Sequence, residues 1–361
     1  MRIAQIAPLA ERVPPKKYGG TERVVFDLTE ELVRRGHDVT LFASGDSETS
    51  AKLSSVTPRG LRETRSQDIY GPNVLSMLNI GVAYSQANNF DIIHDHNGHL
   101  SLPTAQLSPT PVVSTMHGIF TTANKKMFSA LKKPNIVTIS NSQTLSAPDI
   151  NHAGTVYNGL NMDHFPFSEE TDRYLLFVGR ISPEKGVHLA IEAAQELDLP
   201  LIIIAKLESV DMEYFNKYVG PKLSDEIRWV GEMDETERNR YYSRAICLVN
   251  PLTWKEPFGL TMIEAMACGC PVVSFGNGSV PEIVLDGKTG YVVADTEEMI
   301  DRINHIDKIK RSFCRKHVLK NFNEKNMAEG YEKIYQSLLK EKQQHNGIKR
   351  NSIAKQIFPL S

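Results

Sequence analysis

The chain has 361 residues, and at about 100–200 residues per domain this length predicts two domains, each with its own hydrophobic core. Its 41 Lys and Arg residues against 43 Asp and Glu residues give a formal net charge of −2, which argues against a general nucleic-acid binder with a strongly basic face. Hydrophobic residues make up 41% of the chain and charged residues 23%, the balance of a globular protein and not of a disordered one.

The sequence contains no apolar run near the roughly 18–20 residues of a membrane-spanning helix, the longest being Leu199 to Ala205. The N-terminal stretch is too short and soon too charged, with Glu11 and Arg12, for a signal peptide. We therefore expect a cytoplasmic protein, with peripheral membrane contact as the alternative. The four cysteines have no metal-binding spacing, and we expect them to be reduced and buried: Cys247, Cys268, Cys270 and Cys314.

Short runs of β-branched residues alternate with helical stretches almost throughout, the pattern of parallel sheets with crossover helices. The first long helix is expected over Thr21 to Arg35, because apolar residues recur on one face. Thr21 can cap its start, and Gly36 suits the position after its end. The strands expected in the first half are Ile3–Ala7, Val39–Phe42, Ile92–His94, Val112–Thr115, Ile136–Ile139 and Thr155–Tyr157.

A polar stretch without a regular period, Asn158 to Asp172, is interpreted as a linker. The strands expected beyond it are Tyr174–Val178, Leu201–Ile204, Ile227–Val230, Ile246–Val249 and Val272–Phe275. The helices between them are about Val187–Leu197, Glu235–Ala245 and Gly259–Ala267. The pattern predicts an α/β fold of two Rossmann-like, doubly wound domains, residues 1–160 and 161–340, which face each other across a ligand-binding cleft.

The C-terminal part of the chain is expected to contain one more long helix, roughly Asn323 to Leu339, whose apolar stripe packs on a domain, the first domain being one choice. The polar and basic segment 341–361 is expected to be a frayed or disordered tail. The alternative is a weak amphipathic anchor formed by Ile348, Ile353, Ile357 and Phe358.

A short lysine-rich helix is also expected in the first half. It is interpreted as a solvated helix face, with contact to anionic lipid or a charged acceptor as the alternative. Its lysines are Lys125, Lys126, Lys132 and Lys133.

Generic nucleotide-binding motifs are absent from the sequence. No Gly-x-Gly-x-x-Gly follows the first strand, which argues against a dinucleotide dehydrogenase. Glu282 stands where a P-loop ending in Gly287-Lys288-Thr289 needs its first glycine, and the chain has no Asp-x-Asp. An enzyme that handles a nucleoside diphosphate would therefore need protein cations or helix ends in place of a metal clamp.

Two stretches can supply such groups. Gly19-Gly20-Thr21-Glu22 lies just before the first helix, where free backbone N–H groups can bind an anion, although a plain turn explains the glycine pair equally well. Arg180 and Lys185 follow a strand, and two cations at its carboxyl end suit a diphosphate. For either cation alone, a solvated surface position is the simpler interpretation.

The most informative stretch runs from Glu256 to Glu264 across a strand-to-helix turn. Pro257 and Gly259 leave backbone amides free near the helix start. Glu256 could accept hydrogen bonds from sugar hydroxyls, and Glu264, about a turn and a half into the helix, could hold a ribose. The alternative is a helix-start acid beside a solvated helical acid.

The cluster His94-Asp95-His96-Asn97-Gly98-His99 resembles a metal site in composition. Strand alternation places His94 and His96 on one face, but His99 is displaced and no further ligand is identifiable. We therefore expect no metal here. The preferred interpretation is a polar wall where His96 or Asp95 meets acceptor hydroxyls.

The Glu256 to Glu264 stretch, continued through Ala265 to Val273, closely resembles the retaining glycosyltransferases of family 4, the glycosyl transferases group 1. The further signatures, which occur in the family's order and spacing, are Asn158-Gly159-Leu160-Asn161, Val178 to Gly186, Val280-Pro281-Glu282 and Asp286 to Gly290. The resemblance runs from Met1 to about residue 340. It implies a GT-B fold in which the second domain mainly holds the donor and the first mainly holds the acceptor.

The resemblance also implies roles for single residues. Arg180 and Lys185 would bind the donor diphosphate and stabilise the leaving group. Glu256 would bind hydroxyls of the transferred sugar, and His117, in Met116-His117-Gly118, would touch the sugar near its 6-hydroxyl. Glu264 would hold the nucleotide ribose. Further donor contacts would come from Gly20 and from the backbone amides of Phe258, Gly259 and Leu260.

Two stretches depart from the family pattern. Ala205-Lys206-Leu207-Glu208 stands where a Gly-x-Gly turn is frequent, and Lys206 could supply a phosphate contact there. Gly276-Asn277-Gly278-Ser279 stands where paired glycines are frequent, so local sugar contacts differ.

The sequence thus predicts a metal-independent, retaining hexosyltransferase that needs no cofactor. It would move a hexose from a nucleoside-diphosphate sugar, a UDP-sugar and first UDP-glucose, to a hydroxyl of a small molecule, glycan or lipid. The alternatives are a GDP-mannose-dependent mannosyltransferase, a nucleotide-sugar epimerase, a sugar phosphorylase, and an idle nucleotide-sugar-binding protein. No nucleic-acid partner is expected.

Overall fold

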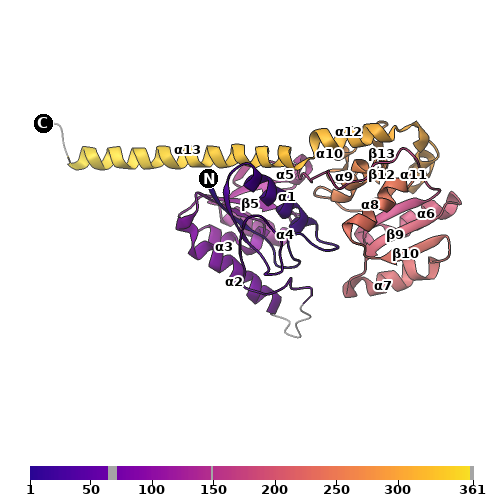
Figure 1. The fold of residues 1–361 in the computed structure, drawn as a ribbon, viewed down its shortest axis with the longest axis horizontal. Helices are drawn as coiled ribbons and strands as arrows, with labels where there is room; N and C mark the ends of the chain where they lie inside the picture. The colour runs from indigo at the N-terminus through magenta and orange to yellow at the C-terminus, as the bar shows by residue number, and fades with distance from the viewer. Residues whose placement is uncertain (64–70, 148, 358–361) are drawn as a thin grey trace.

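The computed structural model describes residues 1–63, 71–147 and 149–357, with side chains as far as Gln344. Two α/β bodies lie side by side, and the C-terminal helix runs back across the first of them (Figure 1). The expected α/β architecture with two parallel sheets is confirmed.

The first sheet contains seven parallel strands within the described residues, in the order β3-β2-β1-β4-β5-β6-β7. They are β1 (Arg2–Ile6), β2 (Asp38–Phe42), β3 (Lys52–Ser54), β4 (Ile92–Asp95), β5 (Val112–Met116), β6 (Asn135–Thr138) and β7 (His152–Thr155). The α-helices that connect them are α1 (Gly20–Arg34), α2 (Gly71–Ser85), α3 (Leu102–Ala105), α4 (Thr122–Ala130) and α5 (Asn141–Ser146).

The second sheet, lying wholly within described residues, contains six parallel strands in the order β10-β9-β8-β11-β12-β13. They are β8 (Leu175–Arg180), β9 (Leu201–Lys206), β10 (Ile227–Gly231), β11 (Leu248–Asn250), β12 (Val272–Phe275) and β13 (Gly290–Val293). The α-helices are α6 (Val187–Glu196), α7 (Met212–Tyr214), α8 (Glu235–Arg244), α9 (Leu260–Ala267), α10 (Val280–Ile283), α11 (Thr296–Ile303), α12 (Arg311–Asn321) and α13 (Glu324–Ile357).

The central strands match the expected segments closely, and the differences lie at the sheet edges. β3 and β13 are edge strands that the sequence pattern misses, and β7, a third edge strand, precedes the expected Thr155–Tyr157. These strands are only three or four residues long, which is too short for a period of apolar residues to stand out.

The start of α1 differs from the expectation in a way that bears on function. Gly19 is the residue before the helix, with φ 158°, and no side chain caps the first turn, so the expected capping by Thr21 is wrong. The end of the helix agrees with the expectation, since Gly36 has the left-handed φ of +84°. The first amides of α1 are therefore left for a ligand or water.

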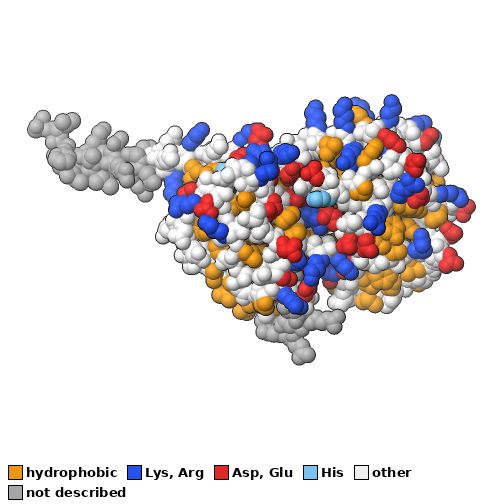
Figure 2. All heavy atoms as spheres, viewed as in Figure 1, with side chains coloured by type: hydrophobic (Ala, Val, Ile, Leu, Met, Phe, Trp, Pro, Cys, Tyr) orange, Lys and Arg blue, Asp and Glu red, His pale blue; other side chains and the backbone are white. Residues whose placement is uncertain are grey.

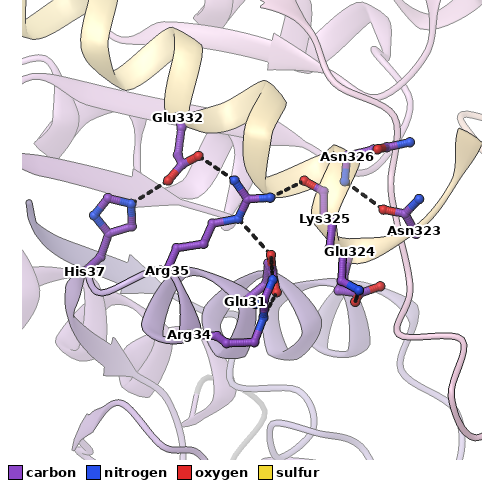
Figure 3. A network of polar contacts seen from close by, with 9 residues as sticks. All are labelled: Glu31, Arg34, Arg35, His37, Asn323, Glu324, Lys325, Asn326 and Glu332. Atoms are coloured by element: carbon purple, nitrogen blue, oxygen red, sulfur yellow. Dashed lines mark hydrogen bonds and ion pairs between the residues drawn. The ribbon is translucent and has the colours of Figure 1, made fainter.

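The helix α13 belongs to the core of the first body. Its buried Met327, Tyr331 and Tyr335 pack with residues of α1 and of the sheet. On its polar side, Glu332 accepts hydrogen bonds from Arg35 at 2.9 Å and from His37 at 2.7 Å (Figure 3). The chain thus crosses to the second body and returns, completing the first fold unit with its last helix.

The C-terminal segment differs from the expected frayed tail, because α13 continues to Ile357. Residues 358–361 and the four side chains of the amphipathic-anchor alternative lie outside the described part. Among described residues, no helix is long and apolar enough to cross a membrane. The four cysteines are free and buried, as expected.

Candidate active site

A cavity of about 490 Å³ lies between the two bodies, within the usual size range of small-molecule sites. Residues of the first body that line it include Tyr18, Gly20, Glu22, Arg62 and His117. Acidic and basic side chains gather along the boundary between the bodies (Figure 2). Ten of the predicted site residues meet in the cavity: Gly20, His117, Arg180, Lys185, Lys206, Glu256, Phe258, Gly259, Leu260 and Glu264.

An ion pair joins the loop after β8 to the loop after β11. The ammonium of Lys185 is 2.6 Å from Glu256 Oε2, and the indole N–H of Trp254 donates to the same oxygen at 3.0 Å. The Lys185 ammonium also lies 4.9 Å from the centre of the Trp254 ring. The side chains of Lys185 and Glu256 are 16% and 10% exposed, so the pair is held at the cavity wall with little freedom.

Two glycine-led helix starts face each other across the cavity. Gly259 precedes α9 with φ +86° and no side chain caps that helix, as at Gly19 before α1. A Cβ on Gly20 would lie 3.1 Å from the Leu260 side chain, so the two helix ends approach closely. Uncapped amides and the positive ends of both helix dipoles form an anion-binding arrangement.

The turn at Gly276-Asn277-Gly278-Ser279 supports the loop that carries Glu256. Gly278 has φ +67°, and a Cβ there would lie 2.3 Å from the carbonyl oxygen of Glu256 and 2.4 Å from its nitrogen. The Ser279 amide donates to the Glu256 carbonyl at 2.9 Å, and its hydroxyl donates to the Phe258 carbonyl at 2.8 Å. The turn that departs from the family pattern is thus built against the site.

Two further cations stand at the carboxyl ends of adjacent strands. Arg180 and Lys206 are register partners of β8 and β9. Each has a local acid partner, Glu184 at 2.7 Å and Glu208 at 2.8 Å. Lys206 lies 5.8 Å from the ring centre of Tyr18 of the first body. Parallel strands end at one edge, which brings both cations to the cavity.

Glu264 is buried and held by two groups of α8. Arg238 donates to its Oε1 at 3.0 Å, and the Tyr242 hydroxyl donates to its Oε2 at 3.2 Å. The alternative of a solvated helical acid is therefore wrong for Glu264. Glu256 is not solvated either, being 8% exposed.

The cavity contains residues that sequence reasoning missed. Glu22, on the first turn of α1, is 5% exposed, and its burial raises its pKa to about 7. Arg62 and Tyr18 are also missed; the guanidinium of Arg62 lies 5.7 Å from the Tyr18 ring centre. Glu22 lies two residues after the glycine pair and could have been included, but Arg62 lies in a long connection without a recognisable pattern.

The predicted acceptor wall is not formed, because Asp95 and His96 lie behind the cavity surface. Asp95 is fully buried and accepts hydrogen bonds from the Tyr84 hydroxyl at 3.0 Å and from the Asn97 amide at 2.8 Å. His96, 3% exposed, contacts His117 and not the cavity. Strand alternation could not show that both faces of β4 are covered. Within the described part of the chain, no group of three or more acidic, histidine or cysteine residues could hold a metal ion.

Comparison with known proteins agrees with this arrangement. Residues 162–346, about half of the chain, match the glycosyl transferases group 1, and residues 18–144 match glycosyltransferase family 4. The chain is 28% identical to a glycogen synthase of Mycobacterium tuberculosis over 78% of this chain and 80% of that protein. It is 26% identical to a phosphatidyl-myo-inositol mannosyltransferase of Propionibacterium freudenreichii over 79% of this chain and 80% of that protein.

The fold is similar to that of solved glycosyltransferase-like proteins. The Anabaena protein HepE, solved in complex with UDP-glucose, superposes with a TM-score of 0.71 at 17% identity, covering 94% of this chain and 99% of that one. This likeness supports the GT-B arrangement of two Rossmann-like bodies around a cavity. The chain belongs to the glycosyl transferases group 1, as a GT-B glycosyltransferase of the family 4 type.

Proposed function

We propose that the protein is a retaining, metal-independent hexosyltransferase, with a nucleoside-diphosphate sugar as donor and UDP-glucose as the first candidate. The observation that carries the proposal is the meeting of three cations and two uncapped helix starts with a buried acid in one cavity: Arg180, Lys185, Lys206, the amides after Gly19 and Gly259, and Glu256. No cofactor enters the proposed reaction.

The diphosphate would lie between the strand ends and the helix starts. Arg180 can bind phosphate oxygens by two N–H groups, and Lys185 adds a point charge. Both cations have carboxylate partners, so their side chains are already positioned before a ligand arrives. Negative charge that develops on the leaving phosphate would meet fixed positive groups, a large source of rate acceleration.

The sugar would lie beside Glu256 and His117, and the ribose beside Glu264. Lys185 and Trp254 contact only Oε2 of Glu256 among the described residues, which leaves Oε1 for a sugar hydroxyl. Glu264 Oε1 and Oε2 each keep further lone pairs beside their contacts with Arg238 and Tyr242.

The transfer would proceed by front-face substitution. The bond between the anomeric carbon and the phosphate oxygen breaks, the acceptor oxygen forms the new bond on the same face, and the departing phosphate takes the acceptor's proton. The protein positions the reactants and stabilises charge. Contacts between the bodies join the two sides of the cavity, including Arg23 with Glu235 at 2.5 Å and the Tyr157 hydroxyl with Glu282 at 2.7 Å. Closer approach of the bodies around bound substrates would exclude water from the reaction.

UDP-glucose is supported by the structural likeness to HepE with this sugar nucleotide bound. GDP-mannose is the second candidate, because a mannosyltransferase is among the relatives. An epimerase or a phosphorylase on the same fold would differ in its requirements: an epimerase needs no acceptor, and a phosphorylase needs free phosphate.

Product analysis tests the proposal. Protein treated with a metal chelator is incubated with UDP-glucose or GDP-mannose and a panel of glycosides, and the products are examined by mass spectrometry and NMR. We expect a new glycoside with the anomeric configuration of the donor and undiminished yield after chelation. An inverted product, a strict metal requirement, or conversion of the donor without an acceptor would contradict it.

A further inference from the structure

A chain of buried hydrogen bonds runs behind His117, the cavity residue that follows β5. His117 Nε2 lies 2.9 Å from His96 Nδ1, and His96 Nε2 lies 2.7 Å from Gln5 Oε1. Gln5 is fully buried on β1, and His96 is 3% exposed just after β4. Because bulk water cannot replace these partners, the protons in the chain depend on one another.

The proton positions follow from Gln5, which stands at one end of this chain of hydrogen bonds. A side-chain carbonyl oxygen can only accept, so His96 must carry its proton on Nε2. Burial lowers the pKa of His96 well below its usual value, so the ring is neutral and its Nδ1 is a lone pair. His117 must then donate from Nε2. Burial lowers the pKa of His117 to about 4, so its Nδ1 is also unprotonated near neutral pH.

The other end of the Gln5 amide is held by a second histidine. Gln5 Nε2 lies 3.4 Å from His94 Nδ1, which also lies 2.6 Å from the Tyr335 hydroxyl of α13. On its far side, His94 Nε2 lies 2.7 Å from the Thr115 hydroxyl. An amide nitrogen that donates toward His94 directs its carbonyl oxygen toward His96, so α13 helps to fix the orientation of Gln5.

We propose that Gln5 and His96 are positioning residues that hold His117 with its proton on Nε2, so that Nδ1 accepts a hydrogen bond from a hydroxyl of the bound sugar. The role of His117 rests on the proposed function; the proton position does not. No other described residue forms a hydrogen bond with His117 Nδ1. The site would therefore favour a group that donates at this position, a hydroxyl, over one that only accepts, such as a carboxylate.

The proton position is measurable on the unaltered protein. Two-dimensional NMR of ¹⁵N-histidine-labelled protein separates protonated from unprotonated ring nitrogens, and a His117→Gln variant identifies the His117 signals. We expect a proton on Nε2 and none on Nδ1. The opposite orientation of the Gln5 amide would reverse every proton in the chain. A proton on Nδ1, or an equal mixture of both forms, would therefore overturn the inference.

A substitution of Gln5 tests whether the proton positions of His96 and His117 are coupled. In Gln5→Glu, a carboxylate facing His96 favours a second proton on that ring, whose Nδ1–H would then donate and force the His117 proton onto Nδ1. We expect the His117 signals to reverse, UDP affinity to stay within about twofold, and UDP-glucose affinity to fall on the order of tenfold, the worth of one hydrogen bond. Unchanged His117 signals would contradict the coupling.

Thr110→Val is the matched control, because it removes a buried hydroxyl of the same body that donates to the Ala87 carbonyl at 2.7 Å, outside the network of Gln5, His94, His96 and His117. It should change neither the His117 signals nor the difference between UDP and UDP-glucose affinity; a reversal of those signals in this variant would count against the inference. If Gln5→Glu does not fold, the spectrum of the unaltered protein decides. If neither nucleotide binds, the proposed function fails while the proton position is still tested.

Discussion

The two walls of the cavity are built from different chemistry. The wall from the second body carries charges that are paired in place, as in Lys185 with Glu256 and Lys206 with Glu208. The wall from the first body presents His117, backed by neutral groups in a buried hydrogen-bond chain. Paired charges suit a diphosphate whose charge changes during reaction, whereas a neutral network suits recognition of a hydroxyl. The second body thus supplies the paired charges, and the first body supplies the orienting network together with the uncapped start of α1.

The largest effect is expected when the charged wall loses a cation. Lys185→Ala should lower kcat on the order of 10²-fold, because it removes a positive charge beside the leaving phosphate. Steady-state kinetics with the identified donor measures this. Lys316→Ala, at an exposed lysine of α12, is the control and should leave turnover unchanged. Near-normal turnover of Lys185→Ala would remove this residue from the proposed mechanism.

Two glycine substitutions can separate the support that Gly278 gives to Glu256 from the cost of backbone strain. Gly278→Ala places a Cβ within 2.4 Å of the Glu256 nitrogen, whereas Gly287, with nearly the same φ of +66°, has nothing within 4 Å of a Cβ. Gly287→Ala should therefore cost only the left-handed strain of about 1–2 kcal/mol in the free energy of unfolding. Gly278→Ala should cost more and also weaken sugar binding. Equal losses in both variants, by denaturant unfolding and kinetics, would contradict the support role.

The pH dependence of the free energy of unfolding should reveal Glu22, the buried acid of the first body. The pKa of Glu22 is raised to about 7 in the folded state, so between pH 4.5 and 7 the unfolded chain releases its proton more readily, and stability falls as pH rises. Glu22→Gln should remove this loss, gaining at most about 3 kcal/mol relative to the unaltered protein between pH 4.5 and 8. Unfolding curves at several pH values measure it, with the exposed Glu297→Gln as control. A pH-independent difference would contradict the buried, protonated state.

The smallest effect is expected where α13 meets α1. Glu332→Ala removes the acceptor shared by Arg35 and His37, and should lower the free energy of unfolding by about 1 kcal/mol. Glu329→Ala, which removes only an exposed ion pair with Lys333 on the same helix, is the matched control and should have less effect. Equal effects would show that the contact in Figure 3 adds nothing to the docking of the helix.

The second body was largely predictable from the sequence, because its site residues follow strands or begin helices. Arg180, Lys206 and Glu256 stand at strand ends or in the loop that follows, and parallel strands bring such positions to one edge. The helical period alone is enough to predict that Glu264 faces the same cavity. Local sequence patterns were sufficient for the second body because its parallel sheet brings the residues at the strand ends together.

The first body was less predictable at its site, because long-range packing decides what is exposed. His96 and Asp95 have the composition of a functional cluster, yet both are buried: Tyr84 of α2 contacts Asp95, and Gln5 of β1 contacts His96. Two tyrosines of α13, more than 200 residues away in sequence, complete the network around His94. The Tyr335 hydroxyl contacts His94 itself, and the Tyr331 hydroxyl contacts Thr115. No periodicity within β4 encodes that contact, and the same holds for Arg62, which reaches the cavity from an irregular connection.

The central claim is that the cavity holds a nucleoside-diphosphate sugar against the charged wall. Thermal unfolding with and without millimolar UDP, GDP, ADP and their common sugar derivatives tests it most directly, because a ligand that binds only the folded state raises its stability. We predict a clear rise in Tm with one nucleotide family, UDP first, and a much smaller rise in Lys185→Ala. No shift with any of these ligands, or an equal shift in the variant, would contradict the account.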